Sequence, residues 1–126
     1  MELKDIKFKA KRLDNGEWIE GSLVKGYINS KEQTYIIPIF NKAGDIKTIE
    51  VNPSTICQFT GLRDKEGNEV WENDILIDDE KIIGYIIFKD SSFYIVNKYN
   101  FPVALFYLTY ENIMLNYKVI SNKFND

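Results

Sequence analysis

The stretch GLRDKEGNEVWENDILI, residues 61–77, carries the pattern that decides the fold of this chain. Its polar run DKEGNE, residues 64–69, is centred on Gly67 and predicts a tight turn between two short strands. Val70 and Trp71 are apolar and follow directly, so we expect them to fix this hairpin to the core. The tripeptide END then predicts a second turn, which leads the chain into another strand. The stretch therefore predicts an architectural corner rather than a reactive centre.

Short apolar runs separated by turn residues continue on both sides of this stretch. β-branched and aromatic residues dominate these runs, a composition that favours strands. NKAGD at 41–45 predicts a turn, and residues 108–115 predict a helical turn. The secondary structure of the run 101–108 is ambiguous, although its proline favours the start of a strand. Strands are expected at residues 6–12, 17–24, 34–40, 46–51, 55–60, 74–77, 81–89, 92–97 and 116–120. About ten short strands with at most one or two helical turns predict an all-β barrel or sandwich.

The first predicted element is an N-terminal hairpin. Residues 6–12, IKFKAKR, alternate apolar and basic side chains, which is the period of a strand with one exposed face. The DNG sequence at 14–16 predicts its turn, because Asn and Gly tolerate positive φ angles. Residues 17–24 return as the second strand, and we expect Trp18 to anchor it. Phe8 lies on the opposite face from the lysines, so an aromatic surface and positive charge are not expected to converge. These lysines are Lys7, Lys9 and Lys11.

Size and charge restrict the class of protein. The chain has 126 residues, of which 44% are hydrophobic, enough for one compact domain with two lobes and an ordinary core. A net charge of −3 provides no general attraction to nucleic acid. The charge is uneven, since residues 1–12 carry five basic and two acidic side chains, whereas residues 63–81 carry three basic and eight acidic ones. We interpret both segments as solvated surfaces, and a docking pair within the chain or between subunits is the alternative.

Cysteine and histidine content restricts the chemistry. Cys57 is the only cysteine, so no disulfide forms within the chain, and we expect a buried, inert thiol in a reducing cytoplasm. The chain contains no histidine, which removes the usual base for a thiol or hydroxyl nucleophile. The start MELKDIKFKAK lacks the apolar segment of a signal peptide, and no apolar run is long enough to span a bilayer. We therefore expect a cytoplasmic protein without a cofactor and without membrane contact.

Three segments together resemble the YopX family of phage and prophage proteins. IKFKAKRLDNGEWIEG, residues 6–21, resembles the family's opening hairpin, in which a lysine-rich strand precedes a D-N-G-x-W turn. QFTGLRDKEGNEVWENDILI, residues 58–77, resembles its central signature, Q-[YF]-T-G-L-x-D-x-x-G-x-x-[IV]-[YFW]-E-G-D-I. NYKVISNKFND, residues 116–126, resembles its closing V-I-G-N-x-[YF]-x-N. Asn73 and Ser121 stand where these patterns have glycine, and Asn also tolerates the left-handed conformation.

The resemblance implies a single all-β, YopX-like domain over residues 1–126. It implies an N-terminal β-hairpin lobe at 1–60 and a second lobe at 61–126, in which the part from about Asp74 onward forms a small SH3-like barrel. It also implies a phage or prophage origin in a bacterial host cell, and it supplies no established biochemical activity. We interpret the signature residues as mainly structural: Gly16, Trp18, Gly61, Leu62, Asp64, Gly67, Trp71, Glu72, Asp74, Ile75 and Asn122.

Three classes of function fit these residues. The first, which we favour, is a non-catalytic accessory protein that binds an unknown host or phage protein, or a further copy of itself, through edge strands and exposed aromatic side chains. The second is a small barrel that binds nucleic acid, which the acidic total disfavours. The third is a metal-dependent enzyme that uses Glu72, Asp74 and the acidic run at 78–80, although acidic turns between strands are common. The candidate interaction residues are Lys7, Lys9, Lys11, Asp78, Asp79 and Glu80.

Overall fold

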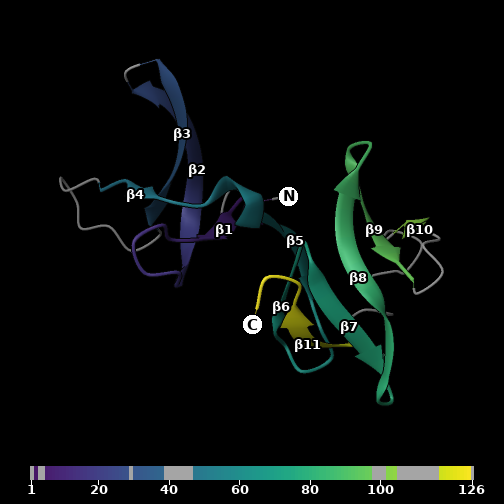
Figure 1. The fold of residues 1–126 in the computed structure, drawn as a ribbon. Coiled ribbons are helices and arrows are strands. Elements are labelled where there is room, and N and C mark those ends of the chain that lie inside the picture. The colour runs from purple at the N-terminus through teal and green to yellow at the C-terminus, as the bar shows by residue number, and fades with distance from the viewer. Residues whose placement is uncertain are drawn as a thin grey trace. The chain divides into compact units, whose positions relative to one another are not determined.

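The computed structural model describes residues 2, 5–28, 30–38, 47–97, 102–104 and 117–125 (Figure 1). These residues form antiparallel strands and the short 3₁₀ helix η2 (Pro53–Thr55), which confirms the all-β prediction. The chain divides into two compact units, unit 1 (Met1–Gln58) and unit 2 (Phe59–Asp126). The predicted turn at 41–45 and the predicted helical turn at 108–115 lie outside the described residues.

Unit 1 is built from antiparallel strands in the order β4-β3-β2-β1-β5. The β1–β2 hairpin confirms the prediction from alternating residues. Its turn has Gly16 at a φ of 72°, and the Glu17 backbone N–H donates to Asn15 Oδ1 at 2.9 Å. Only the first residues of β5 pair with β1 in this unit, and the strand then continues into unit 2. The strands are β1 (Phe8–Lys11), β2 (Trp18–Ile28), β3 (Lys31–Pro38), β4 (Ile49–Glu50) and β5 (Cys57–Arg63).

A small apolar core holds unit 1 together. Ala10, Ile36 and Val51 are buried and come from β1, from β3 and from the residue after β4, so the core joins both sides of β2. Gly21 allows β2 and β3 to approach closely, because a Cβ atom at this position would lie 1.9 Å from the Ile37 carbonyl oxygen. Burial of these few side chains supplies the apolar contribution to the stability of the unit.

Unit 2 contains a β5–β6 hairpin and a five-stranded sheet in the order β10-β9-β8-β7-β11. Phe59 lies opposite Trp71 in the hairpin, and the register shifts before Arg63 pairs with Glu69. The core of the unit consists of buried aliphatic side chains from β6, β7, β8 and β9: Val70, Leu76, Ile86 and Ile95. The strands are β6 (Glu69–Trp71), β7 (Asp74–Asp78), β8 (Lys81–Lys89), β9 (Ser92–Val96), β10 (Pro102–Ala104) and β11 (Lys118–Asn122).

The SH3-like barrel that the resemblance implies is not closed in the part of the chain that the structure describes. β10 and β11 are the two opposite edges of the five-stranded sheet. β10 has three residues, and β11 carries a register shift between Val119 and Ser121. Short and irregular edge strands present few aligned N–H and C=O groups, so they pair poorly with another strand. The described residues therefore form open antiparallel sheets.

Candidate functional site

The central signature forms a connected corner in unit 2. Gly61 and Gly67 have φ angles of 84° and 85°, which residues with a Cβ atom adopt only with strain. Leu62 packs against the core. Trp71 is buried, and its ring centroid lies 5.3 Å from that of Phe59. The glycines thus shape the turns, and the two aromatic rings join β6 to β5.

Asp64 is a fully buried carboxylate that accepts hydrogen bonds from two separate parts of the chain. Its Oδ1 accepts from the backbone N–H groups of Glu66 at 2.9 Å and Asn68 at 2.8 Å, inside the turn. Its Oδ2 accepts from the backbone N–H of Val119 in β11 at 3.0 Å and from Asn68 Nδ2 at 3.4 Å. Asp64 therefore joins the signature turn to a strand 55 residues later in the chain.

The N–H donors determine the charge state of Asp64. Burial alone raises the pKa of this carboxyl, because desolvation disfavours the charged form. The N–H groups of Val119, Asn68 and Glu66 oppose this effect, and together they hold the pKa of Asp64 below its ordinary value of 3.8. Asp64 is consequently a carboxylate at neutral pH, and a poor acceptor of a proton from a substrate.

Asp74 and Asn122 form a second buried polar connection between the signature and β11. Asp74 Oδ2 accepts from the Trp71 backbone N–H at 2.7 Å, and Asp74 Oδ1 accepts from Asn122 Nδ2 at 2.9 Å. Asn122 Nδ2 also donates to the Glu72 carbonyl oxygen at 3.2 Å. A buried carboxylate needs such donors, since an unpaired one carries a large desolvation cost. The Glu72 backbone carbonyl thus takes part in this network.

Asn73 lies at the centre of the turn between these two connections. Its φ angle is 70°, in the left-handed region where the family pattern has glycine. The Asn73 N–H donates to the Ile86 carbonyl oxygen at 2.7 Å, and the Asn73 carbonyl oxygen accepts from the Lys123 N–H at 2.9 Å. Asparagine therefore preserves the turn, and the turn is joined to both β8 and the residues after β11.

The acidic run at 78–80 forms the β7–β8 turn, and its side chains do not form one cluster with those of Glu72 and Asp74. Asp74 and Asp78 are the two ends of β7, about 13 Å apart at the usual rise of a strand. Asp79 and Glu80 have φ angles of 45° and 69°. In the described part of the chain, no group of three or more His, Cys, Asp or Glu side chains is placed to hold a metal ion.

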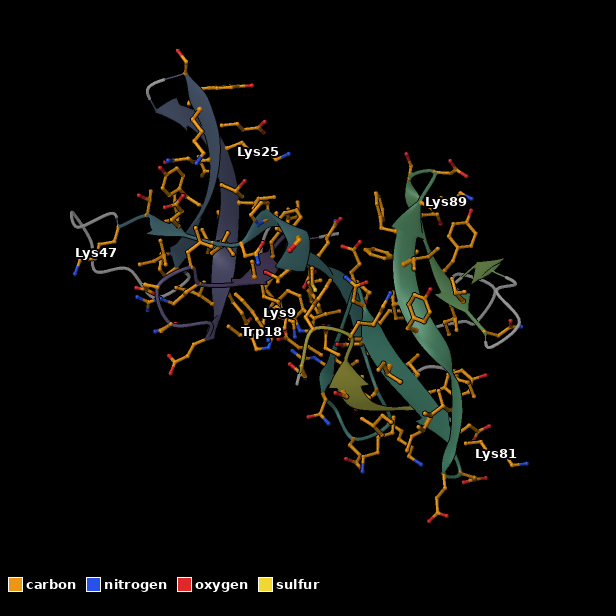
Figure 2. The ribbon with its side chains drawn as sticks, in the orientation of Figure 1. Lys9, Trp18, Lys25, Lys47, Lys81 and Lys89 are labelled. Atoms are coloured by element: carbon orange, nitrogen blue, oxygen red, sulfur yellow. The ribbon has the colours of Figure 1, made fainter. Side chains whose placement is uncertain are left out.

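The lysine face of the N-terminal hairpin contains an aromatic ring that sequence reasoning placed elsewhere. Lys9, which Figure 2 labels beside Trp18, has its Nζ 4.7 Å from the centroid of the Trp18 ring. Lys11 Nζ lies 5.6 Å from the same centroid. Trp18 was expected to anchor the hairpin, but it is half-buried and lies opposite Lys11 in the β1–β2 register, on the lysine face. Lys7 Nζ lies 3.8 Å from Glu20 Oε1. Aromatic surface and positive charge therefore do converge here, through Trp18 rather than Phe8.

The outer part of the β2–β3 hairpin, residues 25–28 and 31–33, is a two-stranded ribbon (Figure 1). β1 pairs with β2 only up to Gly21, β4 pairs with β3 at Tyr35 and Ile36, and the Val51 N–H donates to the Thr34 carbonyl oxygen. No described strand pairs with the outer edges beyond these residues. Tyr27 near the tip is 75% exposed. We call this element the β2–β3 ribbon.

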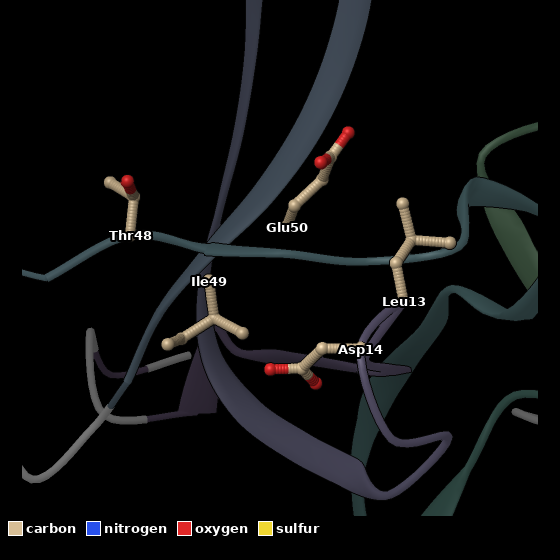
Figure 3. A pocket seen from close by; sticks show the side chains of 5 residues that line it. All are labelled: Leu13, Asp14, Thr48, Ile49 and Glu50. Carbon is tan, nitrogen blue, oxygen red and sulfur yellow. The ribbon is translucent and has the colours of Figure 1, made fainter.

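A cavity of 330 Å³ lies between the β1–β2 turn and β4 in unit 1 (Figure 3). Its two carboxylates do not converge. Figure 3 shows the Asp14 side chain on the same side of β4 as Ile49, whereas the Glu50 side chain points to the opposite side. Arg12 Nε and Nη2 donate to the Asp14 carboxylate at 2.9 and 2.6 Å, and this side-chain hydrogen bonding lowers the pKa of Asp14. The cavity thus lacks a pair of carboxylates arranged for acid–base chemistry. Its lining residues are Leu13, Asp14, Thr48, Ile49 and Glu50.

These features define a class of protein: an all-β chain of two small antiparallel units, in which the buried signature acids Asp64 and Asp74 accept hydrogen bonds from N–H donors. Among the described residues, no helix is long and apolar enough to cross a membrane. No curated protein matches the chain. The family described as YopX protein matches residues 7–125, so the chain belongs to the YopX family, as its three motifs indicate.

Proposed function

We propose that this YopX-family chain is a non-catalytic protein-interaction module that binds its partner through the β2–β3 ribbon. The observation that carries the proposal is the pair of outer edges to which no described strand is added, beside an exposed tyrosine. An edge strand can accept an extended segment of another protein by main-chain hydrogen bonding, and tyrosine is a frequent interface anchor. A two-stranded ribbon is marginally stable alone, so an added strand would also stabilise it.

The charges of the ribbon define the chemistry of its partner. Lys25 Nζ lies 3.9 Å from Glu32 Oε1, and both side chains are more than half exposed. Lysine on an edge strand opposes pairing with an apolar or basic strand. Lys25 and Tyr27 are two residues apart in β2 and lie on the same face, so the partner segment would present an acidic and an apolar side chain two residues apart on one face.

The polar network of unit 2 supports a non-catalytic assignment. The Asp64 oxygens accept from N–H donors, and the two Asp74 oxygens accept from Trp71 and Asn122. Catalytic carboxylates need an accessible oxygen and a pKa matched to proton transfer, whereas the Asp64 pKa is lowered and its side chain is buried.

The family resemblance supports a wider setting for this module. We infer that the chain is an accessory protein of a phage or prophage, acting in the cytoplasm of the bacterial host. Self-association is included in the proposal, because a second copy presents the same edges. An SH3-like arrangement of unit 2 belongs to the same inference from the family.

Photocrosslinking at the tip tests the proposal. Tyr27 is replaced by p-benzoylphenylalanine, and an exposed residue of unit 1, Ser54, receives the same group as a matched control. We expect discrete protein adducts from position 27, absent at position 54, and their loss when Lys25→Glu is added. Equal, diffuse adducts from both positions would contradict a role for the ribbon. Mass spectrometry of the adduct distinguishes a host or phage protein from a second copy.

Nucleic-acid binding is a second candidate because Trp18 lies within 6 Å of two lysine ammonium groups. Aromatic rings and lysines at one surface can bind single strands. Glu20 beside Lys7 reduces the charge of this face, so we rank the candidate second. A Trp71→Phe variant leaves Trp18 as the only tryptophan, and its fluorescence reports binding of oligothymidine. Quenching that weakens with salt and is lost in Lys9→Gln/Lys11→Gln would establish this function over the first.

A further inference from the structure

Unit 2 contains a second cavity, of 270 Å³, on the face of the β7-β8-β9 sheet that carries Ile75. Ile75 lies opposite Tyr85, and Tyr85 lies opposite Val96, so these three side chains form a row across three neighbouring strands. Gly84 beside the row contributes no side chain, and a Cβ atom there would lie 2.1 Å from the Val96 carbonyl oxygen. The lining residues are Ile75, Ile82, Gly84, Tyr85, Val96, Asn97 and Lys123.

Lys123 places a positive charge at this apolar cavity. Its Nζ lies 4.2 Å from the centroid of the Tyr85 ring. Its backbone is held in place, because the Lys123 N–H donates to the Asn73 carbonyl oxygen and the preceding residue, Asn122, is buried in the polar network. No carboxylate lies within ion-pair distance of Lys123 in the described ranges of the chain. This is notable because residues 59–126 carry eleven acidic and seven basic side chains.

Apart from Asn97, the remaining wall of the cavity is apolar. The Ile82 side chain is 64% exposed, next to the half-buried side chains of Ile75 and Tyr85. Water bound here gains little from the walls, so an apolar group that displaces it gains free energy. A fully apolar ligand would leave the ammonium without an anion, whereas a carboxylate would form a charge-assisted hydrogen bond with it.

We propose that this cavity binds a small monocarboxylate with an aromatic or branched aliphatic body. The carboxylate contacts Lys123 Nζ, and the apolar body lies over Ile75 and Val96, against Ile82. The cavity volume of 270 Å³ is below the roughly 300–1,000 Å³ of pockets for drug-sized ligands, so the ligand has about one ring. The site lies wholly within unit 2 and does not depend on the role proposed for the β2–β3 ribbon.

Ligand-observed NMR titration with phenylacetate tests the site on the full chain. We expect saturable binding in the millimolar range, and at least tenfold weaker binding of phenylacetamide, which has the same body without the charge. Lys123→Met should abolish binding of phenylacetate, and Ile82→Ser should weaken it. Lys89→Met is the matched control, since Lys89 is an exposed lysine of the same unit that does not line the cavity (Figure 2).

Three results would overturn the proposal: no saturable binding of phenylacetate, equal binding of phenylacetamide, or equal losses from Lys123→Met and Lys89→Met. Circular dichroism of each variant checks that the fold is intact. Ile82→Ser also keeps the test valid if Lys123→Met unfolds the protein, because Ile82 is mostly exposed and its replacement leaves the core unchanged.

Discussion

Replacement of Asp64 by asparagine should destabilise unit 2 by about 2–4 kcal/mol. Asp64→Asn keeps the shape of the side chain but puts an NH₂ group where one carboxylate oxygen stood. Oδ1 faces the N–H groups of Glu66 and Asn68, and Oδ2 faces the N–H of Val119, so in either orientation the NH₂ group meets a donor. At least one N–H then loses its acceptor, which costs about 1–3 kcal/mol, and the remaining bonds lose the strength given by the charge.

Urea denaturation monitored by tryptophan fluorescence measures this loss. A Trp18→Phe background leaves Trp71 as the reporter, and Trp71 is in unit 2. Glu66→Gln is the control, because it neutralises an exposed carboxylate of the same turn and should change the free energy of unfolding by about 0–1 kcal/mol. If Asp64→Asn is as stable as Glu66→Gln, the buried carboxylate does not hold the turn to β11 and our reasoning is wrong.

The wild type and Asp64→Asn should also differ in how their stability depends on pH, and the sign of this difference follows from the pKa of Asp64. The folded pKa of Asp64 lies below its ordinary value of 3.8, so the charged form is stabilised by folding. This stabilisation is fully present above the unfolded pKa and is lost as the pH falls through the folded pKa. The stability difference between the wild type and Asp64→Asn should therefore be constant from pH 7 to about pH 5 and shrink below about pH 4. A difference that grows on acidification would contradict the assigned direction.

Three further substitutions test the packing and the turns. Trp71→Ala should cost about 3–5 kcal/mol of stability, measured by thermal unfolding, and unchanged stability with loss of a partner would instead mark Trp71 as a binding residue. Glu80→Gly should raise the free energy of unfolding by about 0.5–1 kcal/mol, because Glu80 has a φ of 69° and glycine adopts a positive φ without strain. A melting temperature at or below that of the wild type would refute this. Gly21→Ala should prevent normal β2–β3 pairing, because the alanine Cβ would lie 1.9 Å from the Ile37 carbonyl oxygen. An unchanged melt by circular dichroism would show that β2 and β3 can move apart at this position.

Local patterns in the sequence predicted the parts of the fold that depend on near neighbours. The β1–β2 hairpin follows from alternating side chains around an Asn-Gly turn, and the β5–β6 hairpin follows from the turn around Gly67. The contact of Asp64 with Val119 spans 55 residues, and no local periodicity encodes it. The polar network around Asp64 was therefore missed, although Asp64 itself stood out in the motif.

Trp18 shows a second limit of sequence reasoning. A large aromatic residue in a strand usually anchors a core, yet here the cross-strand position opposite Lys11 places it among lysines. The hydrocarbon parts of lysine side chains and the cation–π attraction make such a surface favourable for tryptophan. Strand register decides on which face of the sheet a side chain lies. Register depends on the turn and on the pairing partner, and composition alone does not determine it.

The connection of Asp64 and Asp74 to β11 has a consequence for synthesis on the ribosome. Each described strand pair of unit 1 is complete once Gln58 has emerged, whereas the network of unit 2 needs Val119 and Asn122. At translation rates of roughly 5–20 residues per second, unit 2 waits roughly 3–13 s longer than unit 1 for its last strand. In the last part of that interval, once Val96 has been made, the apolar strands β7, β8 and β9 are present without the edge that β11 provides. Nascent chains are thus most exposed to chaperones and proteases late in synthesis, and a stop codon before Asn122 would leave unit 2 without one partner of its polar network.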